Sequence, residues 1–334
     1  MITLDAFRAL ADPTRLRIMR LLASMELAVG ELAQVLGQSQ PRVSRHVKIL
    51  CDAGLAERRR EGGWVFLRAA VNENPVLSRH GALGAAFARL LDQADSEDSA
   101  FARHSAEDRQ HLGAIREARE ANAADYFARH AGQWDELRSL HIADGPVEAA
   151  LSEMLGSALG DLLDIGTGTG RMAELFAPAA DHVVAFDKSP EMLRIARARL
   201  QHLPSEQVDL VRGDFGALPF AAASFDTVLF HQVLHYAQAP ELALAEAARV
   251  TRPGGRIAIV DFAAHDREEL RERHAHARLG FSDAQVAALL SDAGFESEAD
   301  RALAGRELIV KIWTGVRRDD AQAPAQLPLR KAGG

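Results

Sequence analysis

The glycine-rich stretch at positions 164–170 runs Asp164-Ile165-Gly166-Thr167-Gly168-Thr169-Gly170. Apolar residues at 162–163 precede it and predict a strand, while the run 171–176 after it predicts a helix. Glycine allows a tight turn and a close approach of the backbone to a ligand, and the amides at a helix start can also face that ligand. The stretch therefore predicts a ligand-binding loop between a strand and a helix.

Strand-like and helix-like runs alternate through the second half of the chain. Short apolar runs predict buried strands, and apolar residues at helical spacing predict the helices between them. The predicted strands span residues 162–165, 183–186, 208–212, 227–230 and 256–261, with late strands near 298–302 and 307–314, and the predicted helices span 146–158, 171–176, 190–200, 240–250 and 283–293. This order predicts an α/β, doubly wound, Rossmann-like sheet.

Three carboxylates fall at the ends of predicted strands, where a doubly wound sheet binds its ligand. Asp187 ends the second strand, 17 residues beyond Gly170, and can accept hydrogen bonds from both hydroxyls of a ribose. Asp214 ends the third strand and can accept one from an adenine amino group. A dinucleotide fits less well, because the last glycine of its pattern would fall at Arg171 and its pyrophosphate would meet Asp164. Asp164 instead suits a cationic amino-acid group.

The N-terminal part of the chain shows a different pattern. A short helix at 31–36 is closed by Gly37 and followed by a helix over 39–51, the order of a helix-turn-helix. Two strand-like runs at 55–61 and 64–68 then flank a Gly-Gly turn. These elements predict an α-rich winged helix-turn-helix domain, so the fold class is multidomain.

Polar side chains on the second of these helices and on the wing are the candidate contacts to a double-stranded DNA operator. Short side chains and amides reach base edges in the major groove, and Arg and Lys meet phosphates. The candidates are Ser39, Gln40, Arg42, Ser44, Arg45, His46 and Lys48 on the helix and Arg58, Arg59 and Arg60 on the wing.

Length and charge agree with two domains. A chain of 334 residues exceeds what one core usually serves. Residues 1–92 contain 13 Lys and Arg against 9 Asp and Glu, a net charge of +4, so the whole-chain charge of −8 leaves −12 for the remainder. A polyanionic partner therefore fits only the N-terminal part.

Several features exclude other classes of protein. No apolar run is long enough to span a membrane, and the N-terminus predicts an amphipathic helix, so we expect a cytoplasmic protein with no membrane partner. The single Cys51 can form neither an internal disulfide nor a thiolate cluster. His80, His104 and His111 lack the spacing of a metal site, so we expect no metal and solvated or capping histidines.

Two segments lie between the predicted domains. Residues 93–121 are charged and poor in large apolar groups, which predicts a partly helical linker that only spaces the domains. Aromatic residues then gather between Tyr126 and Trp134, either to cover a ligand or to pack in the core. We therefore expect four regions: a DNA-binding and dimerisation domain at 1–92, the linker at 93–121, the ligand-binding domain at 122–316 and a disordered tail at 317–334.

Residues 4–70 resemble the ArsR-type winged-helix regulators, through LADPTRLRIMRLL, ELAQVLGQSQPRVSRHVKILCDAGL and the basic wing. The resemblance implies a homodimer paired through terminal helices, and a helix from Asn74 or Pro75 to Asp92 would form that surface. Metal-sensing members carry cysteines before the recognition helix. This chain has Glu26-Leu27-Ala28-Val29-Gly30 there, which excludes thiolate sensing at that place.

Residues 122–315 resemble class I S-adenosylmethionine (SAM)-dependent methyltransferases of the ubiquinone/menaquinone type, through DLLDIGTGTG, AFDKS, GDFGALPF, FDTVLFHQVLHY and RPGGRIAIVDF. The resemblance implies that SAM binds and that S-adenosylhomocysteine is the product. The implied cofactor contacts are Tyr126, Asp164, Gly166, Thr167, Gly168, Gly170, Asp187, Lys188, Asp214, Phe215 and His231.

The acceptor side of such a site follows the fourth and fifth strands. His235 and Tyr236 are the candidate catalytic residues, and Asp261 is a further candidate, although a histidine at a helix start can also serve packing alone. The protein mainly has to align the acceptor with the methyl group and, where needed, remove a proton. Residues 274–281 are expected, by analogy alone, to line the acceptor pocket.

The resemblances leave two hypotheses of function. The first is a DNA-binding transcriptional regulator that also methylates a small molecule. The second is a repressor whose methyltransferase-like domain only senses SAM or S-adenosylhomocysteine. Arsenic methylation is disfavoured because the required cysteines are absent. Nucleic-acid base methylation is disfavoured because His231-Gln232-Val233-Leu234 replaces an Asn/Asp-Pro-Pro-Tyr motif.

Overall fold

The computed structural model describes residues 2–61, 64–70, 90, 93, 97–139, 142–305 and 307–319. Contacts divide the chain into two compact units. The N-terminal unit comprises Met1–Phe127, Tyr236–Ala239 and Ala264–Leu279, and the sheet unit comprises Ala128–His235, Pro240–Ala263 and Gly280–Gly334. The N-terminal unit thus includes two short segments from the later sequence, which differs from the uninterrupted division expected above.

A winged helix-turn-helix forms the first part of the N-terminal unit, as predicted. Asp12 caps the second helix by accepting a hydrogen bond from the Arg15 amide at 3.0 Å, and Gly37 ends the third with a φ of 62°. The elements are α1 (Ile2–Leu10), α2 (Pro13–Ser24), β1 (Leu27–Ala28), α3 (Val29–Leu36), α4 (Gln40–Asp52), β2 (Ala56–Glu61) and β3 (Trp64–Ala69). The strands form an antiparallel sheet in the order β1-β3-β2.

Apolar residues at helical spacing hold this unit together. Val43, Val47 and Leu50 are buried on α4, against a core that includes Ile18 and Leu32. Each such side chain contributes about 1.5 to 3 kcal/mol on full burial. One face of α4 is therefore fixed in the core, and its polar residues lie on the other faces.

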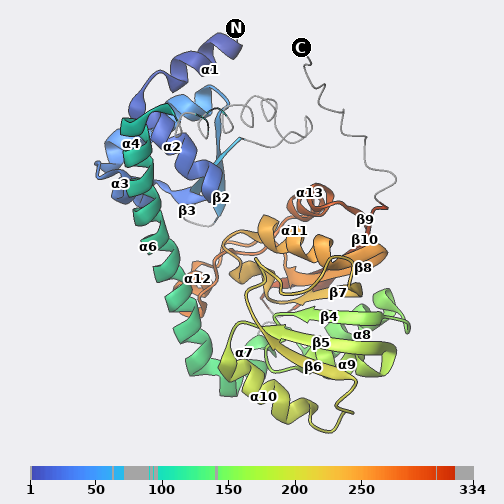
Figure 1. Cartoon of the computed structure of the whole chain (residues 1–334). Coiled ribbons are helices and arrows are strands. Elements are labelled where there is room, and N and C mark those ends of the chain that lie inside the picture. Colours follow the sequence, from blue (N-terminus) through green and yellow to red (C-terminus); the bar gives the residue numbers. More distant parts are fainter. Residues whose placement is uncertain are drawn as a thin grey trace. The chain divides into compact units, whose positions relative to one another are not determined.

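A helix of 32 residues, α6 (Ser99–His130), covers most of the predicted linker and the start of the aromatic segment (Figure 1). Its N-terminal half buries Ser105, Asp108, Leu112 and Ile115, spaced by three or four residues, and the last two belong to the core of the winged helix. Asp108 accepts two hydrogen bonds from Arg17, at 2.6 and 2.7 Å. This half of α6 is part of the N-terminal unit and not only a spacer.

The sheet unit contains a doubly wound α/β fold, as predicted (Figure 1). Its strands are β4 (Gly160–Ile165), β5 (Ala180–Asp187), β6 (Val208–Arg212), β7 (Phe225–His231), β8 (Thr251–Phe262), β9 (Phe295–Ala304) and β10 (Ile309–Arg317). Its helices are α7 (Trp134–Ser139), α8 (Asp144–Leu155), α9 (Arg171–Phe176), α10 (Pro190–Leu200), α11 (Pro240–Val250) and α13 (Asp283–Ala293), with short 3₁₀ turns at Ala131–Gln133, Ala177–Ala179 and Leu234–Tyr236.

The strand order is β6-β5-β4-β7-β8-β10-β9. The first five strands in this order are parallel, and β10 lies antiparallel between β8 and β9. The order reverses direction at β4, so the carboxyl ends of β4 and its neighbours meet at the place where such sheets bind ligands.

One helix of the structure was not predicted, and two predicted segments lie wholly or partly outside the described residues. A helix that we did not predict, α12 (Glu268–His274), lies in a segment of the N-terminal unit. The expected dimer helix from Asn74 or Pro75 to Asp92 and the Gly-Gly turn of the wing fall outside the described residues, apart from Leu90. The predicted tail begins within β10, which continues to Arg317, and its residues after Asp319 are outside them too.

Candidate functional site

The glycine loop joins β4 to α9 in a conformation that its glycines make possible. Gly166, Gly168 and Gly170 have φ angles of 71°, 55° and 81°. A Cβ atom at Gly166 would lie 2.3 Å from Val233 Cγ2, which no packed structure tolerates. The amides of Gly166 and Thr167 donate to the Phe186 carbonyl oxygen at 2.8 and 3.0 Å. The loop is thus fixed against the end of β5.

Asp164 is completely buried at the end of β4. Its Oδ2 atom accepts a hydrogen bond from Thr167 Oγ1 at 2.6 Å, while Oδ1 has no hydrogen-bond partner. Burial raises the pKa of Asp164 to about 7, and the negative charge of Asp187 adds to the effect against the opposing Thr167 hydrogen bond. A buried carboxylate of this kind is stabilised by a proton or a cation at Oδ1.

Asp187 and Asp214 leave adjacent parallel strands at the same edge of the sheet. Asp187 is partly buried, which raises its pKa, and its carboxylate accepts hydrogen bonds from the Gly168 and Ser189 amides at 2.9 and 2.8 Å. Burial alone would raise the pKa of Asp214, but hydrogen bonds from Lys188 Nζ and the Gly216 amide, both at 2.8 Å, hold it below its usual value.

These contacts bear on the predicted ligand residues in different ways. Asp187 is bound to the glycine loop through the Gly168 amide. Lys188 is engaged by Asp214, and Phe215 beside it is partly buried. The sequence analysis placed Asp187, Lys188, Asp214 and Phe215 at one edge of the sheet. It did not indicate the ion pair between Lys188 and Asp214.

Two histidines follow β7 in different environments. Burial, together with the positive charges of Arg138 and Arg171, lowers the pKa of His231 to about 3, so His231 is neutral at physiological pH. His235 is also buried, and Asp261 binds it twice: its Oδ1 lies 2.7 Å from His235 Nδ1, and its Oδ2 accepts the His235 amide at 3.1 Å. The structure therefore brings together the predicted residues His235 and Asp261.

Charged residues of α7 contact the glycine loop, and the sequence analysis did not identify them. Asp135 Oδ1 accepts a hydrogen bond from Thr169 Oγ1 at 2.7 Å, and Arg199 binds both residues. The side chain of Arg138 is only 7% exposed and donates to Asp144 Oδ2 at 3.1 Å. The one sequence signal for Asp135 and Arg138 is their position at and just after the end of the aromatic segment.

The two aromatic residues expected near the ligand belong to different units. The indole Nε1 of Trp134 would lie 3.4 Å from a Cβ atom added at Gly168, so this ring packs on the glycine loop. Tyr126 belongs to the N-terminal unit, where its hydroxyl lies 2.7 Å from His274 Nδ1. Tyr236 belongs there too, with its ring 4.8 Å from that of Phe127.

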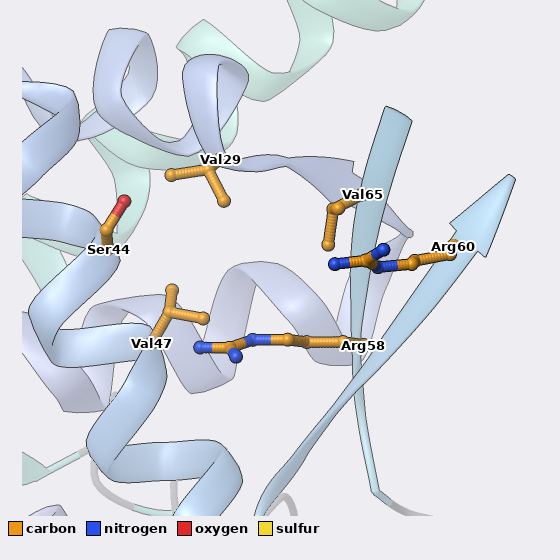
Figure 2. A pocket seen from close by; sticks show the side chains of 6 residues that line it. All are labelled: Val29, Ser44, Val47, Arg58, Arg60 and Val65. Atoms are coloured by element: carbon orange, nitrogen blue, oxygen red, sulfur yellow. The ribbon is translucent and has the colours of Figure 1, made fainter. Parts of the chain in front are cut away.

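The helix-turn-helix surface exposes most of the predicted DNA contacts. Ser39, Gln40, Arg42, Ser44, Arg45 and Lys48 are exposed on or just before α4. His46 is partly buried, with Nδ1 3.7 Å from Asp12 Oδ1. Arg58 and Arg60 are exposed on β2 and, together with Ser44 and Val47 of α4, line a pocket of about 230 Å³ (Figure 2). The pocket lies between helix and wing and presents two guanidinium groups.

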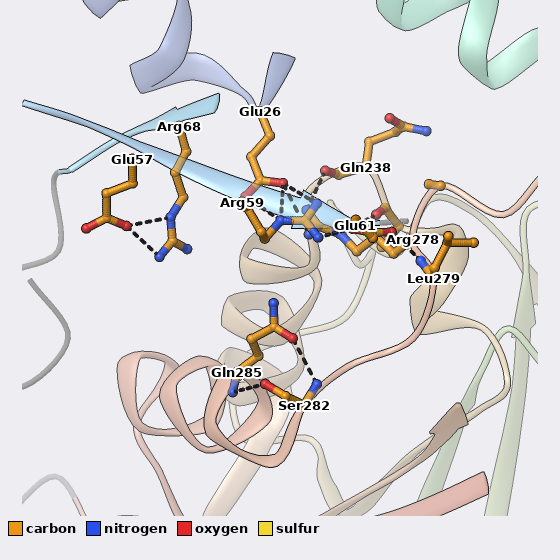
Figure 3. Close-up of polar contacts among 12 residues, drawn as sticks. Glu26, Glu57, Arg59, Glu61, Arg68, Gln238, Arg278, Leu279, Ser282 and Gln285 are labelled. Carbon is orange, nitrogen blue, oxygen red and sulfur yellow. Dashed lines mark hydrogen bonds and ion pairs between the residues drawn. The ribbon is translucent and has the colours of Figure 1, made fainter. Parts of the chain in front are cut away.

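Arg59 corrects the prediction that all three wing arginines contact phosphate. Successive side chains of a strand point to opposite faces, so Arg59 points away from Arg58 and Arg60. It is only 14% exposed and forms ion pairs with Glu26, at 2.8 Å, and with Glu61 (Figure 3). Its charge is neutralised inside the unit.

Glu61, at the end of β2, connects the wing to the segment 264–279. Its carboxylate accepts hydrogen bonds from Arg271, at 2.8 Å, and from the Leu279 amide. Arg278 of the same segment lies 3.2 Å from Glu26 (Figure 3). The guanidinium groups of Arg59 and Arg271 lie over the Phe66 ring, 5.2 and 5.1 Å from its centroid. We call these residues of the N-terminal unit the wing cluster.

The described part of the chain contains neither a metal-binding group of side chains nor a membrane-spanning helix. No group of three or more His, Cys, Asp or Glu side chains in those ranges is arranged to hold a metal ion. None of the described helices is long and apolar enough to cross a membrane.

Comparison with known proteins matches both units. Residues 163–259 match the model of a methyltransferase domain, and residues 12–58 match the model of the bacterial regulatory protein, arsR family. The malonyl-[acyl-carrier protein] O-methyltransferase of Herminiimonas arsenicoxydans is 33% identical over 204 residues, which cover 57% of this chain and 74% of that protein. A chain of similar fold occurs in the solved complex between the Haloferax volcanii Trm112 methyltransferase activator and a methyltransferase. The match has 22% identity and a TM-score of 0.51, and it covers 59% of this chain and 98% of that chain.

A further relative is the demethylmenaquinone methyltransferase of Renibacterium salmoninarum, which is 41% identical over 101 residues. The match covers 30% of this chain and 40% of that protein. The chain spans 40 to 50% of the length of the first curated relatives that it matches, so their similarity is confined to part of each protein.

Proposed function

Since the chain belongs to the methyltransferase family and carries an arsR-family helix-turn-helix domain, we propose that it is a DNA-binding regulator that methylates a small molecule with SAM. The observation that carries the enzymatic part is the buried carboxylate of Asp164, whose Oδ1 has no partner beside the glycine loop. That site fits a ligand with a cationic group, which SAM provides.

The other carboxylates fit the remaining parts of SAM. Asp187 keeps lone pairs for the ribose hydroxyls, and Asp214 and Phe215 stand at the next strand end for the adenine. The loop residues Gly166, Thr167, Gly168 and Gly170 allow the close approach that the ligand needs, and neutral His231 adds no charge beside a sulfonium. Lys188 contributes by orienting Asp214.

SAM supplies a methyl group that is already activated by its sulfonium sulfur, so the chain has to position the acceptor and, for some acceptors, take up a proton. Asp261 next to Nδ1 of His235 favours the tautomer with the proton on Nδ1, which makes Nε2 the basic nitrogen. We propose His235 as the acceptor-side residue of the sheet unit.

Calorimetry tests this proposal. We expect wild-type protein to bind SAM and S-adenosylhomocysteine, and absence of binding by both would contradict it. The two curated relatives are named for different acceptors, demethylmenaquinone and malonyl-[acyl-carrier protein], so turnover is measured with a panel that contains a quinol, a phenol and a carboxylic acid. His235→Gln should lower kcat on the active acceptor and leave S-adenosylhomocysteine affinity unchanged.

The DNA-binding part rests on the exposed polar face of α4 and on the pocket with Arg58 and Arg60. A phosphate group is the natural partner of two guanidinium groups beside a recognition helix. We also propose a homodimer through residues 74–92, which operator half-sites would match by symmetry. Sedimentation of the full chain tests it, because a monomer at all concentrations would contradict the dimer.

The wing cluster favours a second candidate, in which ligand binding also regulates the DNA-binding unit. The segment 264–279 directly follows β8, the strand that carries Asp261, and it is bound to Glu61 and Glu26 of the winged helix. A ligand that shifts this segment would shift the wing. Operator affinity at fixed salt should therefore change with S-adenosylhomocysteine, and equal affinity with and without it would sink the sensing candidate.

A further inference from the structure

The pocket of about 230 Å³ between the recognition helix α4 and the wing lies within the N-terminal unit (Figure 2). Its lining combines three valine side chains from different elements with one hydroxyl and two guanidinium groups. These residues are Val29 of α3, Ser44 and Val47 of α4, Val65 of β3, and Arg58 and Arg60 of β2. Apolar surface with a few converging polar groups is typical of a site for a small molecule.

The two guanidinium groups of the pocket carry charge that the chain does not neutralise. Among the described residues, no carboxylate forms an ion pair with Arg58 or Arg60, whereas Arg59 between them pairs with two glutamates on the other face of the strand. Arg58 lies beside the Cys51 thiol, but burial raises the pKa of this thiol, so it brings no negative charge. The pocket therefore has an excess of positive charge that favours an anion.

The valines of the pocket favour an anion with an apolar part. Val47 is 1% exposed and belongs to the core of the winged helix, while Val29 and Val65 remain partly exposed. A DNA phosphate has no apolar surface and would leave these two side chains in contact with water. An organic anion with an apolar body covers them and gains from the apolar area removed from water.

We propose that this pocket binds a small carboxylate with an apolar body, with the carboxylate on Arg58 and Arg60 and the apolar body on the valines. Planar guanidinium groups match the geometry of a carboxylate. The same two arginines are the wing residues proposed above to contact DNA phosphates, so the ligand and DNA compete for them. The ligand thus lowers the affinity for DNA, and this part of the inference rests on the proposed DNA binding.

Three probes test the site by ligand-observed NMR titration of the full chain. Hexanoate has both features, acetate has the charge without the apolar chain, and hexanamide has the chain without the charge. Because each fully buried methylene strengthens binding about fourfold, wild-type protein should bind hexanoate at least about tenfold more tightly than acetate. It should also prefer hexanoate to hexanamide, since charge-assisted hydrogen bonds are the strong ones. Hexanoate that binds no more tightly than either probe would overturn the inference.

Variants locate the bound hexanoate. Arg60→Gln should weaken it about tenfold, because a charge-assisted hydrogen bond is lost. Arg68→Gln is the matched control on the same wing, since Arg68 pairs with Glu57 on the other face, and it should change the affinity less than about twofold. Val65→Thr, of similar shape, should reduce the preference for hexanoate over acetate. Unchanged hexanoate affinity in Arg60→Gln would place the ligand in another site and overturn the inference.

A DNA duplex of mixed sequence measures the competition, because phosphate contacts do not depend on sequence. By fluorescence anisotropy, hexanoate at about ten times its Kd should weaken the duplex by up to about tenfold relative to acetate at the same ionic strength. Equal duplex affinity in the two salts would overturn the competition. Duplex binding without hexanoate binding refutes the inference alone, whereas hexanoate binding without duplex binding refutes the proposed DNA-binding function and leaves the ligand site supported.

Discussion

Carboxylates removed from solvent have opposite surroundings in the two units. In the wing cluster, Glu26 and Glu61 are surrounded by arginines, and although burial alone would raise the pKa of Glu26, Arg278 and Arg59 hold it below its usual value. In the sheet unit, Asp164 has one hydroxyl donor and an open oxygen, and burial raises its pKa to about 7. The first arrangement is complete within the chain, whereas the second leaves one carboxylate oxygen without a hydrogen-bond partner.

The number of partners that the chain itself provides distinguishes a carboxylate that stabilises the fold from one that can bind a ligand. A carboxylate saturated by the chain's own cations stabilises the folded unit but has nothing left to bind. A carboxylate that is buried and incompletely paired lowers the stability of the ligand-free protein and gains from a cation.

Breaking the wing cluster should have the largest effect. Glu61→Gln leaves the buried cations Arg59 and Arg271 without their shared carboxylate, and loss of one partner from a buried ion pair costs about 3 to 5 kcal/mol. Denaturant unfolding should show the N-terminal unit destabilised by about this amount. Glu57→Gln is the control, because its pair with Arg68 is exposed and is worth at most about 1 kcal/mol. Equal effects of the two substitutions would contradict the comparison.

The ligand-free sheet unit should lose stability as the pH rises. Asp164 binds its proton more tightly when folded, with a pKa of about 7 against an ordinary 3.8, so its contribution is present below about pH 4 and is lost as the pH passes through 7. A shift of this size corresponds to about 4 kcal/mol. Urea unfolding at about pH 5 and pH 8 measures the decline, and Asp164→Asn should reduce it. A decline of the same size in the variant would assign it to other groups.

Removing the proposed ribose contact should have a smaller effect, on binding. Asp187→Ala should weaken S-adenosylhomocysteine by about 2 kcal/mol, roughly thirtyfold, since hydrogen bonds to a charged group are worth about 1.5 to 3 kcal/mol. Because Asp187 also accepts the Gly168 amide, Asp187→Asn serves as the control that keeps one acceptor oxygen. Unchanged affinity in the alanine variant would mean that the ribose contact lies elsewhere.

The smallest expected effect concerns the outer face of the wing. Arg60→Ala removes one proposed phosphate contact, so the slope of log affinity against log salt should fall by about one, with little change in sequence preference. Operator binding measured by anisotropy over a salt series gives the slope. Arg194→Ala, an exposed arginine of α10, should leave the slope unchanged. The same slope in both variants would place the wing away from the DNA backbone.

Local signals predicted much of the fold. The helices expected at 171–176, 190–200, 240–250 and 283–293 coincide with α9, α10, α11 and α13. Their boundaries carry capping residues such as Ser189 and Ser282, whose side chains accept amide hydrogen bonds three residues on. Apolar spacing and caps act over a few residues, so one sequence contains them in full.

Contacts between distant residues could not be predicted in this way. Glu61 meets Arg271 and Leu279 across more than 200 positions, and nothing in the spacing of single charges relates them. Arg138 is one arginine among many until its burial and its unsatisfied Nε are seen. The orientation of Arg59 could have been predicted, because side chains alternate along a strand and Arg59 therefore points away from Arg58 and Arg60.

The long contact between Glu61 and Leu279 has a consequence for synthesis. The two residues are 218 positions apart, so the wing cannot acquire its last partners until the ribosome has made five of the seven strands of the sheet unit. Closing so long a loop is slow, and until then Phe66 and the buried arginines lack the cover of α12 and its neighbours. The apolar core of the winged helix, which lies between Ala6 and Ile115, can form earlier, so only the wing cluster waits for the segment 264–279.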